Sequence, residues 1–432
     1  MPDHTFVLRS MGCKSNQFEG SLVIEQLVLS GFTAANDLSA ADFFILNSCT
    51  VTEKSDTEAL YHLRHAKRSN PKIKTVITGC LAQTEKEKLL KLPFIDYVFG
   101  NDDKFDMPNL LLNDIKTKIT DLSNTEEFNY QVLNEISRTR FSLKIQDGCN
   151  NRCAYCIIPF ARGKSRSASS EFIINQINHA AEIGFKEVVF TGIHIGQWGA
   201  EKHKTLFDLL KEVENKTTIT RYRLGSLNPL EISSDLLNLL QNSNKFCPHF
   251  HLSLQSACDK TLRAMKRFYN TDNYLEQIED ITQRFDKPFI GADIIAGFCG
   301  ETEDDFELTV SNLKKAKLTK IHTFPYSKRK GTFAETQSGH LPEKVKKQRA
   351  EVIKKISNMK FAEFLRKNTG TVHEVLIEKR PDKRTGLLKG VTRNYLNVLI
   401  ENTNGAENYF NTLQKVQILG VEKGMCIGEL LY

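Results

Sequence analysis

The first hundred residues alternate short apolar runs with amphipathic or polar stretches of helical period. Strands separated by helices in this way are typical of a parallel sheet with crossover connections. A polar, weakly patterned segment at 101–139, rich in Asn, Asp and Thr, predicts the boundary of this unit. The predicted strands lie at 4–10, 43–46, 74–78 and 94–99, the last of the unit, and the predicted helices at 16–30, 53–69 and 85–92.

The same alternation restarts after this boundary with longer periods. Six apolar runs, most of them followed by a helix pattern, predict a partial or complete α/β barrel. The predicted strands lie at 141–145, 187–191, 222–224, 250–254, 289–296 and 320–324.

A basic helix at 343–367 precedes a tail of different character. Its apolar runs at 372–377, 395–400 and 416–419 are separated by Gly and Asn turns, without helix patterns between them, which favours a small β-barrel. We therefore expect an α/β protein with three domains at about 1–115, 135–366 and 367–432.

Length and composition agree with a folded, soluble protein of several domains. The chain has 432 residues, of which 40% are hydrophobic and 26% charged. We see neither an apolar run approaching about 18 residues nor a secretory signal, so we expect a cytoplasmic protein without a membrane anchor. Lys and Arg number 59 against 52 Asp and Glu, a net charge of +7 that favours an anionic partner such as nucleic acid.

Ten cysteines need a chemical explanation, because a reducing cytosol does not sustain a disulfide framework. Cys149, Cys153 and Cys156 follow the first strand of the second unit, and thiolates so close together are soft ligands for iron or zinc. A structural zinc site would need a fourth Cys or His at finger-like spacing, and none lies nearby in the sequence. Three thiolates on a four-iron cluster leave one iron open to chelate a substrate or cofactor. A purely structural metal site is the alternative.

A second set of cysteines recurs after strands of the first unit. Cys13, Cys49 and Cys80 each fall in the loop just after a predicted strand. Since the carboxyl ends of parallel strands meet at one edge of a sheet, these thiols converge unless their placement is accidental. Convergence predicts a second cluster with an open iron. The other four cysteines are expected to be packed apolar side chains, namely Cys247, Cys258, Cys299 and Cys426.

The triplet C-x3-C-x2-C after a barrel strand resembles the radical S-adenosylmethionine (SAM) enzymes. GCKSNQ, NSCTVT and TGCLAQ with IQDGCNNRCAYCIIPFARG are similar to the methylthiotransferases over essentially the whole chain, and the tail resembles their TRAM RNA-binding module. The resemblance implies two 4Fe-4S clusters, one on each cysteine triplet, and SAM used in two ways. One SAM donates a methyl group to a sulfur at the N-terminal cluster, and another supplies a radical that abstracts hydrogen from an inert C–H bond.

KIQDGCN, HTFPYSKRKGTFAET and GVTRNYLNVLI are similar to one branch of that family. This branch methylthiolates C-2 of N6-threonylcarbamoyladenosine at position 37 of tRNA. The sister branches, which act on isopentenyladenosine in tRNA or on an aspartate of a ribosomal protein, are alternatives within the enzyme class. A non-catalytic, metal-containing RNA-binding protein is the alternative from another class.

The resemblance further implies SAM contacts at Gly192, Gln255 and Ser256. It also implies three partners: the anticodon loop of tRNA, an electron donor such as a flavodoxin or ferredoxin, and a sulfur donor. Basic groups, among them Lys379–Arg380 and Lys383–Arg384, are suited to neutralise RNA phosphates.

Overall fold

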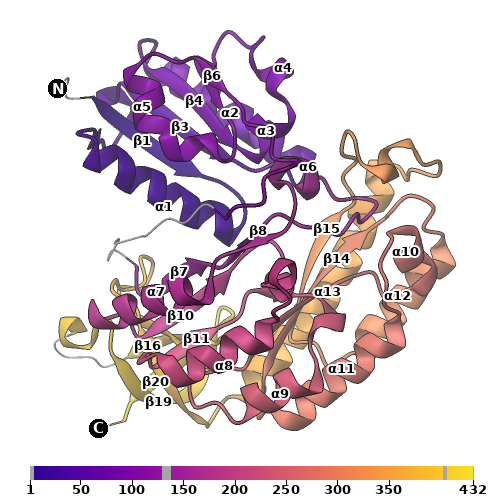
Figure 1. The fold of residues 1–432 in the computed structure, drawn as a ribbon. Coiled ribbons are helices and arrows are strands. Elements are labelled where there is room, and N and C mark those ends of the chain that lie inside the picture. The colour runs from indigo at the N-terminus through magenta and orange to yellow at the C-terminus, as the bar shows by residue number, and fades with distance from the viewer. Residues whose placement is uncertain (1–3, 129–137, 402–405, 432) are drawn as a thin grey trace.

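The computed structural model describes residues 4–128, 138–401 and 406–431. The predicted start of the second domain at residue 135 therefore lies outside the described residues. Figure 1 shows a parallel sheet with helices, a central α/β unit and a small C-terminal β-barrel. The expected fold class is confirmed. Of the helices described, none combines the length and apolarity required to traverse a bilayer.

The N-terminal sheet is parallel throughout and has helices on both faces. Its β3 strand is buried at every position, because the apolar run FFIL faces a helix layer on each side. Leu63 of α2 packs in the hydrophobic cluster of one face, and Val23 of α1 in that of the other. In spatial order the strands are β2 (Thr33–Ala34), β1 (Thr5–Ser10), β3 (Phe43–Ser48), β4 (Lys74–Gly79), β5 (Tyr97–Phe99) and β6 (Thr117–Lys118). The helices are α1 (Lys14–Leu29), α2 (Glu53–Ser69), α3 (Cys80–Thr84), α4 (Lys86–Leu89) and α5 (Met107–Leu112).

Two predictions for this unit were wrong. The helix expected at 85–92 is only the single turn α4, and α3 before it was not predicted. The strand at 94–99 is not the last, since β6 pairs with β5 at the sheet edge. Both residues of β6 are exposed, and its pairing consists of backbone hydrogen bonds, such as that from the Gly100 amide to the Lys118 carbonyl at 2.9 Å. An edge strand held in this way leaves no apolar pattern in the sequence.

The central unit contains all six predicted strands as a partial parallel barrel. β7 and β15 are the outer strands, and a break in pairing separates β11 from the short extra strand β12. The strands are β7 (Phe141–Lys144), β10 (Glu187–Thr191), β11 (Arg221–Arg223), β12 (Ser226–Leu227), β13 (His249–Gln255), β14 (Phe289–Ala296) and β15 (Lys320–Pro325), with a separate hairpin of β8 (Gln146–Asp147) and β9 (Arg166–Ser167). The helices are α6 (Ile158–Arg162), α7 (Ser170–Glu182), α8 (Leu206–Lys216), α9 (Ser234–Gln241), α10 (Asp259–Ala264), α11 (Thr271–Arg284), α12 (Glu303–Lys315) and α13 (Glu343–Lys367).

The C-terminal part is a closed five-stranded barrel in the order β16-β17-β18-β20-β19. β17 and β20 were not predicted, because each contains a glycine that weakens a strand pattern. The barrel needs both glycines: a Cβ at Gly390 would lie 2.6 Å from the Leu376 carbonyl oxygen, and one at Gly428 would lie 2.7 Å from that of Gln417. The strands are β16 (Val372–Ile377), β17 (Leu388–Thr392), β18 (Asn397–Glu401), β19 (Leu413–Glu422) and β20 (Met425–Leu430).

The small barrel closes the amino-terminal end of the central barrel. Arg221 and Arg223 are fully buried, pair with Glu187, and donate hydrogen bonds to carbonyls at the end of β17 and in the turn after it, including Val391 at 3.0 Å. From the same turn, the ring of Tyr395 packs with its centroid 4.3 Å from that of His249. The C-terminal module is therefore fixed to the barrel by a buried polar interface.

Two valines of β19 give a matched test of the small barrel's core. Val416 is fully buried, whereas Val421 is 42% exposed. We predict that Val416→Ala lowers the local stability of β16–β20 by about 2 kcal/mol, through lost burial and a residual cavity. Hydrogen–deuterium exchange of peptides from these strands measures this change. Val421→Ala is the control, and an equal loss in both variants would contradict the assigned core.

Candidate active site between two cysteine triplets

The structure brings Cys13, Cys49 and Cys80 together at the carboxyl edge of the N-terminal sheet. Cys13 caps the amino end of α1, Cys49 follows β3, and Cys80 opens α3 after β4. Gly12 has a φ of +83°, and a Cβ there would lie 2.7 Å from the Cys49 sulfur. The loops that carry Cys13 and Cys49 therefore touch, which only glycine permits at this position.

The loop of Cys80 packs against the same place. Gly79 has a φ of +88°, and its missing Cβ would lie 2.5 Å from the Ser48 carbonyl oxygen. Burial raises the pKa of the Cys49 thiol to about 12, and the nearby thiols of Cys80 and Cys13 add to the effect. The Cys49 thiol therefore lies close to those of Cys13 and Cys80.

Cys149, Cys153 and Cys156 lie in the loop between β8 and α6. The Cys156 amide donates to the Cys153 carbonyl at 3.1 Å, and burial raises the pKa of the Cys156 thiol to about 12, with contributions from the other two thiols. Two residues that the sequence did not single out reach this loop. His194 Nδ1 lies 3.6 Å from the Cys149 sulfur, and Arg267 Nη1 lies 3.3 Å from that of Cys153.

One cysteine of each triplet lines a common cavity of about 350 Å³. Cys13 lines it from the N-terminal sheet and Cys156 from the barrel loop. Its other walls come from both units and are largely apolar or aromatic. They are Val51, Thr52, Tyr155, Ile157, Ile158, Gln255, Asp293, Ile295, Phe324, Pro325, Tyr326 and Ser327.

The residues expected to contact SAM have different positions. Gln255, at the end of β13 with a φ of +70°, lines the cavity. Gly192 lies in a tight turn after β10, where a Cβ would be 2.9 Å from the Gln146 carbonyl oxygen. Ser256 is buried, with its hydroxyl 3.5 Å from that of Thr309.

The donor chemistry of the two triplets fits iron–sulfur clusters. All ten cysteines are free, and each triplet offers three soft thiol ligands. In the described part of the chain, no group of three or more His, Cys, Asp or Glu side chains converges on a position for a single metal ion. Thiols that hold a four-iron cluster bind separate irons. Because burial keeps Cys49 and Cys156 as neutral thiols, cluster binding must release their protons. The other four cysteines are buried, as expected.

A buried network of charges joins the two units directly beneath the cysteines. Glu19 of α1 is at its centre and accepts from Lys104 at 2.5 Å, Lys144 at 2.6 Å and Arg162 at 2.7 Å. Asp147 accepts from Arg162 at 3.0 Å on the barrel side. Lys104 belongs to the N-terminal unit, whereas Lys144, Asp147 and Arg162 belong to the barrel. The network is therefore a seam between the units.

Two asparagines connect this seam to the cysteine loops. Asn16 donates to carbonyls of the strand ends that precede Cys13 and Cys49, and Arg162 lies 3.4 Å from its side-chain oxygen. Asn101 donates to the Ala161 carbonyl at 2.6 Å and lies 3.7 Å from the Cys80 sulfur. Asn101 thereby fixes α6, which comes just after the second triplet, relative to the Cys80 loop of the first triplet.

The cations of the seam keep both central carboxylates ionised. Burial alone would raise the pKa of Glu19, but Arg162, Lys104 and Lys144 hold it well below its ordinary value. Burial likewise opposes ionisation of Asp147, and Lys144 with two arginines holds its pKa below the usual range.

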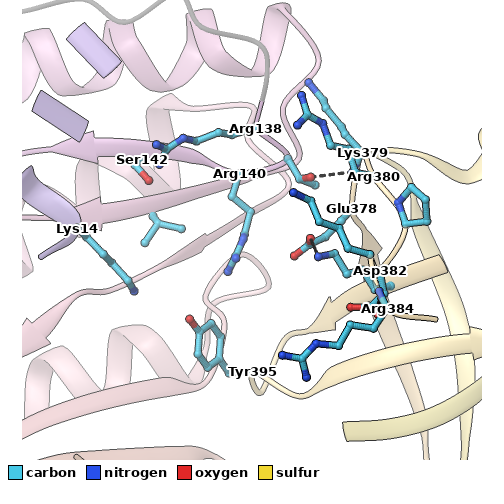
Figure 2. Close-up of a pocket in the computed structure, with 15 residues that line it drawn as sticks. Lys14, Arg138, Arg140, Ser142, Glu378, Lys379, Arg380, Asp382, Arg384 and Tyr395 are labelled. Carbon is cyan, nitrogen blue, oxygen red and sulfur yellow. Dashed lines mark hydrogen bonds and ion pairs between the residues drawn. The ribbon is translucent and has the colours of Figure 1, made fainter. Parts of the chain in front are cut away.

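A second, open pocket of about 650 Å³ lies where all three parts of the chain meet (Figure 2). Lys14 of the N-terminal unit, Arg140 of the segment before β7 and Tyr395 of the C-terminal barrel line it together. Basic side chains outnumber acidic ones in the lining, where Glu378 and Asp382 supply the carboxylates. The basic lining residues are Lys14, Arg138, Arg140, Lys379, Arg380, Lys383, Arg384 and Lys389. Such a pocket suits an anionic ligand.

Comparison with known proteins finds similarity along most of the chain. A family model described as the radical SAM superfamily matches residues 143–313, and one described as uncharacterized protein family UPF0004 matches residues 5–100. The threonylcarbamoyladenosine tRNA methylthiotransferase MtaB of Aquifex aeolicus is 36% identical, over 85% of this chain and 91% of the relative. The tRNA-2-methylthio-N(6)-dimethylallyladenosine synthase of Thermodesulfovibrio yellowstonii is 32% identical, over 91% and 92% respectively.

Among solved structures, the radical SAM methyltransferase TsrM of Kitasatospora setae, with cobalamin and a [4Fe-4S] cluster bound, matches with a TM-score of 0.54. It is 12% identical, and the match covers 77% of each chain. Similarity at this level of identity shows a shared fold.

The seam gives a prediction for stability. Glu19→Gln leaves buried cations without their shared partner, and we expect it to lower the free energy of unfolding by about 3–5 kcal/mol at pH 7. Because the pKa of Glu19 is depressed in the folded state, the difference from wild type should persist down to about pH 5 and shrink below about pH 4. Chemical denaturation at several pH values measures it. Glu363→Gln, which breaks an exposed pair with Lys367, should change stability by less than about 0.5 kcal/mol, and equal effects of the two variants would refute the role of the seam.

Proposed function

This chain belongs to the methylthiotransferases of the radical SAM superfamily, and from that membership we propose that it methylthiolates C-2 of N6-threonylcarbamoyladenosine at position 37 of tRNA. One observation carries the proposal: a single cavity touches one cysteine of each triplet, Cys13 and Cys156. A base held there is within reach of both centres. The product would be 2-methylthio-N6-threonylcarbamoyladenosine.

We assign the ligands of the two 4Fe-4S clusters to the two triplets. Cys13, Cys49 and Cys80 would hold one cluster, and Cys149, Cys153 and Cys156 the other. Held there with SAM, the clusters would supply the chemistry that removes hydrogen from the base and puts a methylthio group in its place. Each triplet contributes three thiols, so one iron of each cluster is left for a non-protein ligand.

The remaining walls of the cavity bind and shield the reactants. Phe324, Tyr326 and Tyr155 offer aromatic faces against which a nucleobase can stack, and such apolar walls exclude water from a reactive radical. Gln255 lies at the cavity and is proposed to contact SAM, together with Gly192 and Ser256 in the adjoining loops. Arg267, beside Cys153, is placed to interact with groups bound at that triplet.

The basic pocket supports binding of tRNA. Its outer rim, from Lys379 to Arg384 in the C-terminal barrel, presents exposed cations that suit RNA phosphates. We propose that the anticodon loop is the part bound at the cavity, since its bases are already unpaired and unstacking them costs little. A flavodoxin or ferredoxin as reductant, a separate sulfur donor and a cytoplasmic location complete the proposal.

Isopentenyladenosine in tRNA is the second candidate substrate, favoured by the largely apolar cavity walls and by the relative from Thermodesulfovibrio. Mass spectrometry of tRNA nucleosides from cells lacking the gene separates the two. Loss of the threonylcarbamoyl methylthio nucleoside alone is expected. Loss of the isopentenyl methylthio nucleoside instead would overturn the proposal, and loss of neither would favour a non-catalytic RNA-binding protein.

Single cysteine variants test the division between the triplets. We predict that Cys153→Ala abolishes SAM cleavage, whereas Cys49→Ala leaves SAM cleavage measurable and stops methylthiolation. Anaerobically reconstituted wild type should hold about eight irons, and each variant about four. Cys426→Ala, at a buried cysteine of the C-terminal barrel, should retain both activities. Equal loss of both activities in Cys49→Ala and Cys153→Ala would contradict the assignment.

The basic pocket gives a second test. Lys383→Ala removes an exposed lining cation, and we predict that it lowers the slope of log K against log salt for tRNA binding by about one. Lys423→Ala, an exposed lysine outside the pocket, is the matched control and should leave the slope unchanged. Filter binding or fluorescence anisotropy at several salt concentrations gives both slopes, and equal slopes for the two variants would exclude this rim as a phosphate contact.

A further inference from the structure

Lys14 is the residue that the N-terminal unit contributes to the lining of the basic pocket, and within the described part of the chain its ammonium group has no partner of opposite charge. No ion pair or hydrogen bond engages its ammonium group among residues 4–128, 138–401 and 406–431. The ammonium nitrogen lies 5.9 Å from the centroid of the Tyr395 ring. Figure 2 shows Lys14 and Arg140 extending from different elements toward the space above Tyr395. A free ammonium inside a pocket is available to a ligand.

The anionic groups of the pocket are already engaged elsewhere. Glu378 pairs with Lys389 at 3.1 Å. Asp382 accepts hydrogen bonds from the backbone amides of Arg384 and Thr385 at 3.0 and 3.1 Å. Both acids belong to the rim formed by the C-terminal barrel. The charge of Lys14 is therefore left for a group that the chain itself does not supply.

Lys14 also connects this pocket with the cavity between the cysteines. It follows Cys13, which lines that cavity, and it begins α1. Inside the barrel, Asp293 of the cavity wall bonds His251 at 2.9 Å, and the His251 ring lies 5.4 Å from that of His322. The charge of Lys14 acts on His322, whose pKa is lowered mainly by burial. Lys14 thus lies one residue from the cavity lining and within electrostatic range of a histidine inside the barrel.

We infer that Lys14 is a specificity-determining residue that pairs with the carboxylate of the threonylcarbamoyl group on the target adenine. The inference rests on the proposed function. The two candidate bases differ in charge at the N6 substituent, since the threonylcarbamoyl group carries a carboxylate and the isopentenyl group is neutral and apolar. An unpaired ammonium lining the pocket favours the first over the second, because the carboxylate gives the charge a partner and an apolar group gives it none.

The test compares anticodon stem-loops that carry threonylcarbamoyladenosine, isopentenyladenosine or unmodified adenosine at position 37. Equilibrium binding and kcat/KM are measured on reconstituted wild type and Lys14→Met. We expect Lys14→Met to lose about tenfold to a hundredfold in affinity and in kcat/KM for the threonylcarbamoyl loop, and less than about threefold for the other two. Lys14→Arg should restore most of the preference, because it restores the positive charge.

Arg384→Met is the matched control at the rim of the same pocket. As a phosphate contact it should weaken binding of all three loops alike, with a reduced salt slope. If Lys14→Met behaves in that way, Lys14 contacts the RNA backbone and the inference is wrong. Retention of the wild-type preference by Lys14→Met overturns it equally.

The iron content of Lys14→Met shows whether the loop of Cys13 tolerates the substitution. If Lys14→Met loses iron, the neutral variant Lys14→Gln, which has a side chain of similar length, is compared with wild type in its place. The wild type tests the proposed function separately. A wild-type enzyme that prefers the isopentenyl loop refutes the proposed substrate, whereas a wild-type preference for the threonylcarbamoyl loop that survives both neutral variants refutes only the role of Lys14.

Discussion

The fold depends most on the buried charges at the seam between the N-terminal sheet and the barrel. Glu19 and Asp147 are ionised in a nearly dry environment, and each needs cations from its surroundings to compensate its lost hydration. Arg162 serves both carboxylates, and Glu19 of the N-terminal unit takes two of its three cations, Lys144 and Arg162, from the barrel. Sliding one unit along the other would leave buried charges without partners in a low-dielectric interior. The two units are thus fixed in one relative position.

Because the two units are fixed in this position, a cysteine from each triplet lines the same cavity. The loops of the first triplet are held by Asn16 and Asn101, and both asparagines also contact the barrel side of the seam. Glycines at 12 and 79 allow the loops to approach each other to van der Waals contact. The proposed reaction requires one base to reach both cysteine triplets. Rigid elements hold the triplets at such a distance more precisely than flexible linkers would.

The other end of the barrel is closed by the C-terminal module, which also adds charge. Arg221 and Arg223 are buried with Glu187 and bind backbone carbonyls of the small barrel, so this interface too is polar and specific. The module then brings its basic loop next to Lys14 and Arg140, and the pocket in Figure 2 exists only because three distant segments meet. The central cavity is mostly apolar and the adjoining pocket is cationic, which suits a base with a charged substituent on a charged backbone.

The sequence by itself determined the regular elements, the three-part architecture and the two cysteine triplets, because these depend on local patterns. α2 and α13 have the predicted bounds. Each cysteine of the first triplet comes just after a strand of the parallel sheet, and this placement predicts that the three cysteines converge. Tertiary structure alone decided the rest. β6, β17 and β20 were not predicted, because β6 is held by backbone pairing and β17 and β20 contain glycine. Buried charges such as Glu19 and Arg162 look like surface charges in the sequence, in which they lie 143 residues apart. Whether a charged side chain is buried depends on which distant partner reaches it, and a one-dimensional pattern carries no record of that partner.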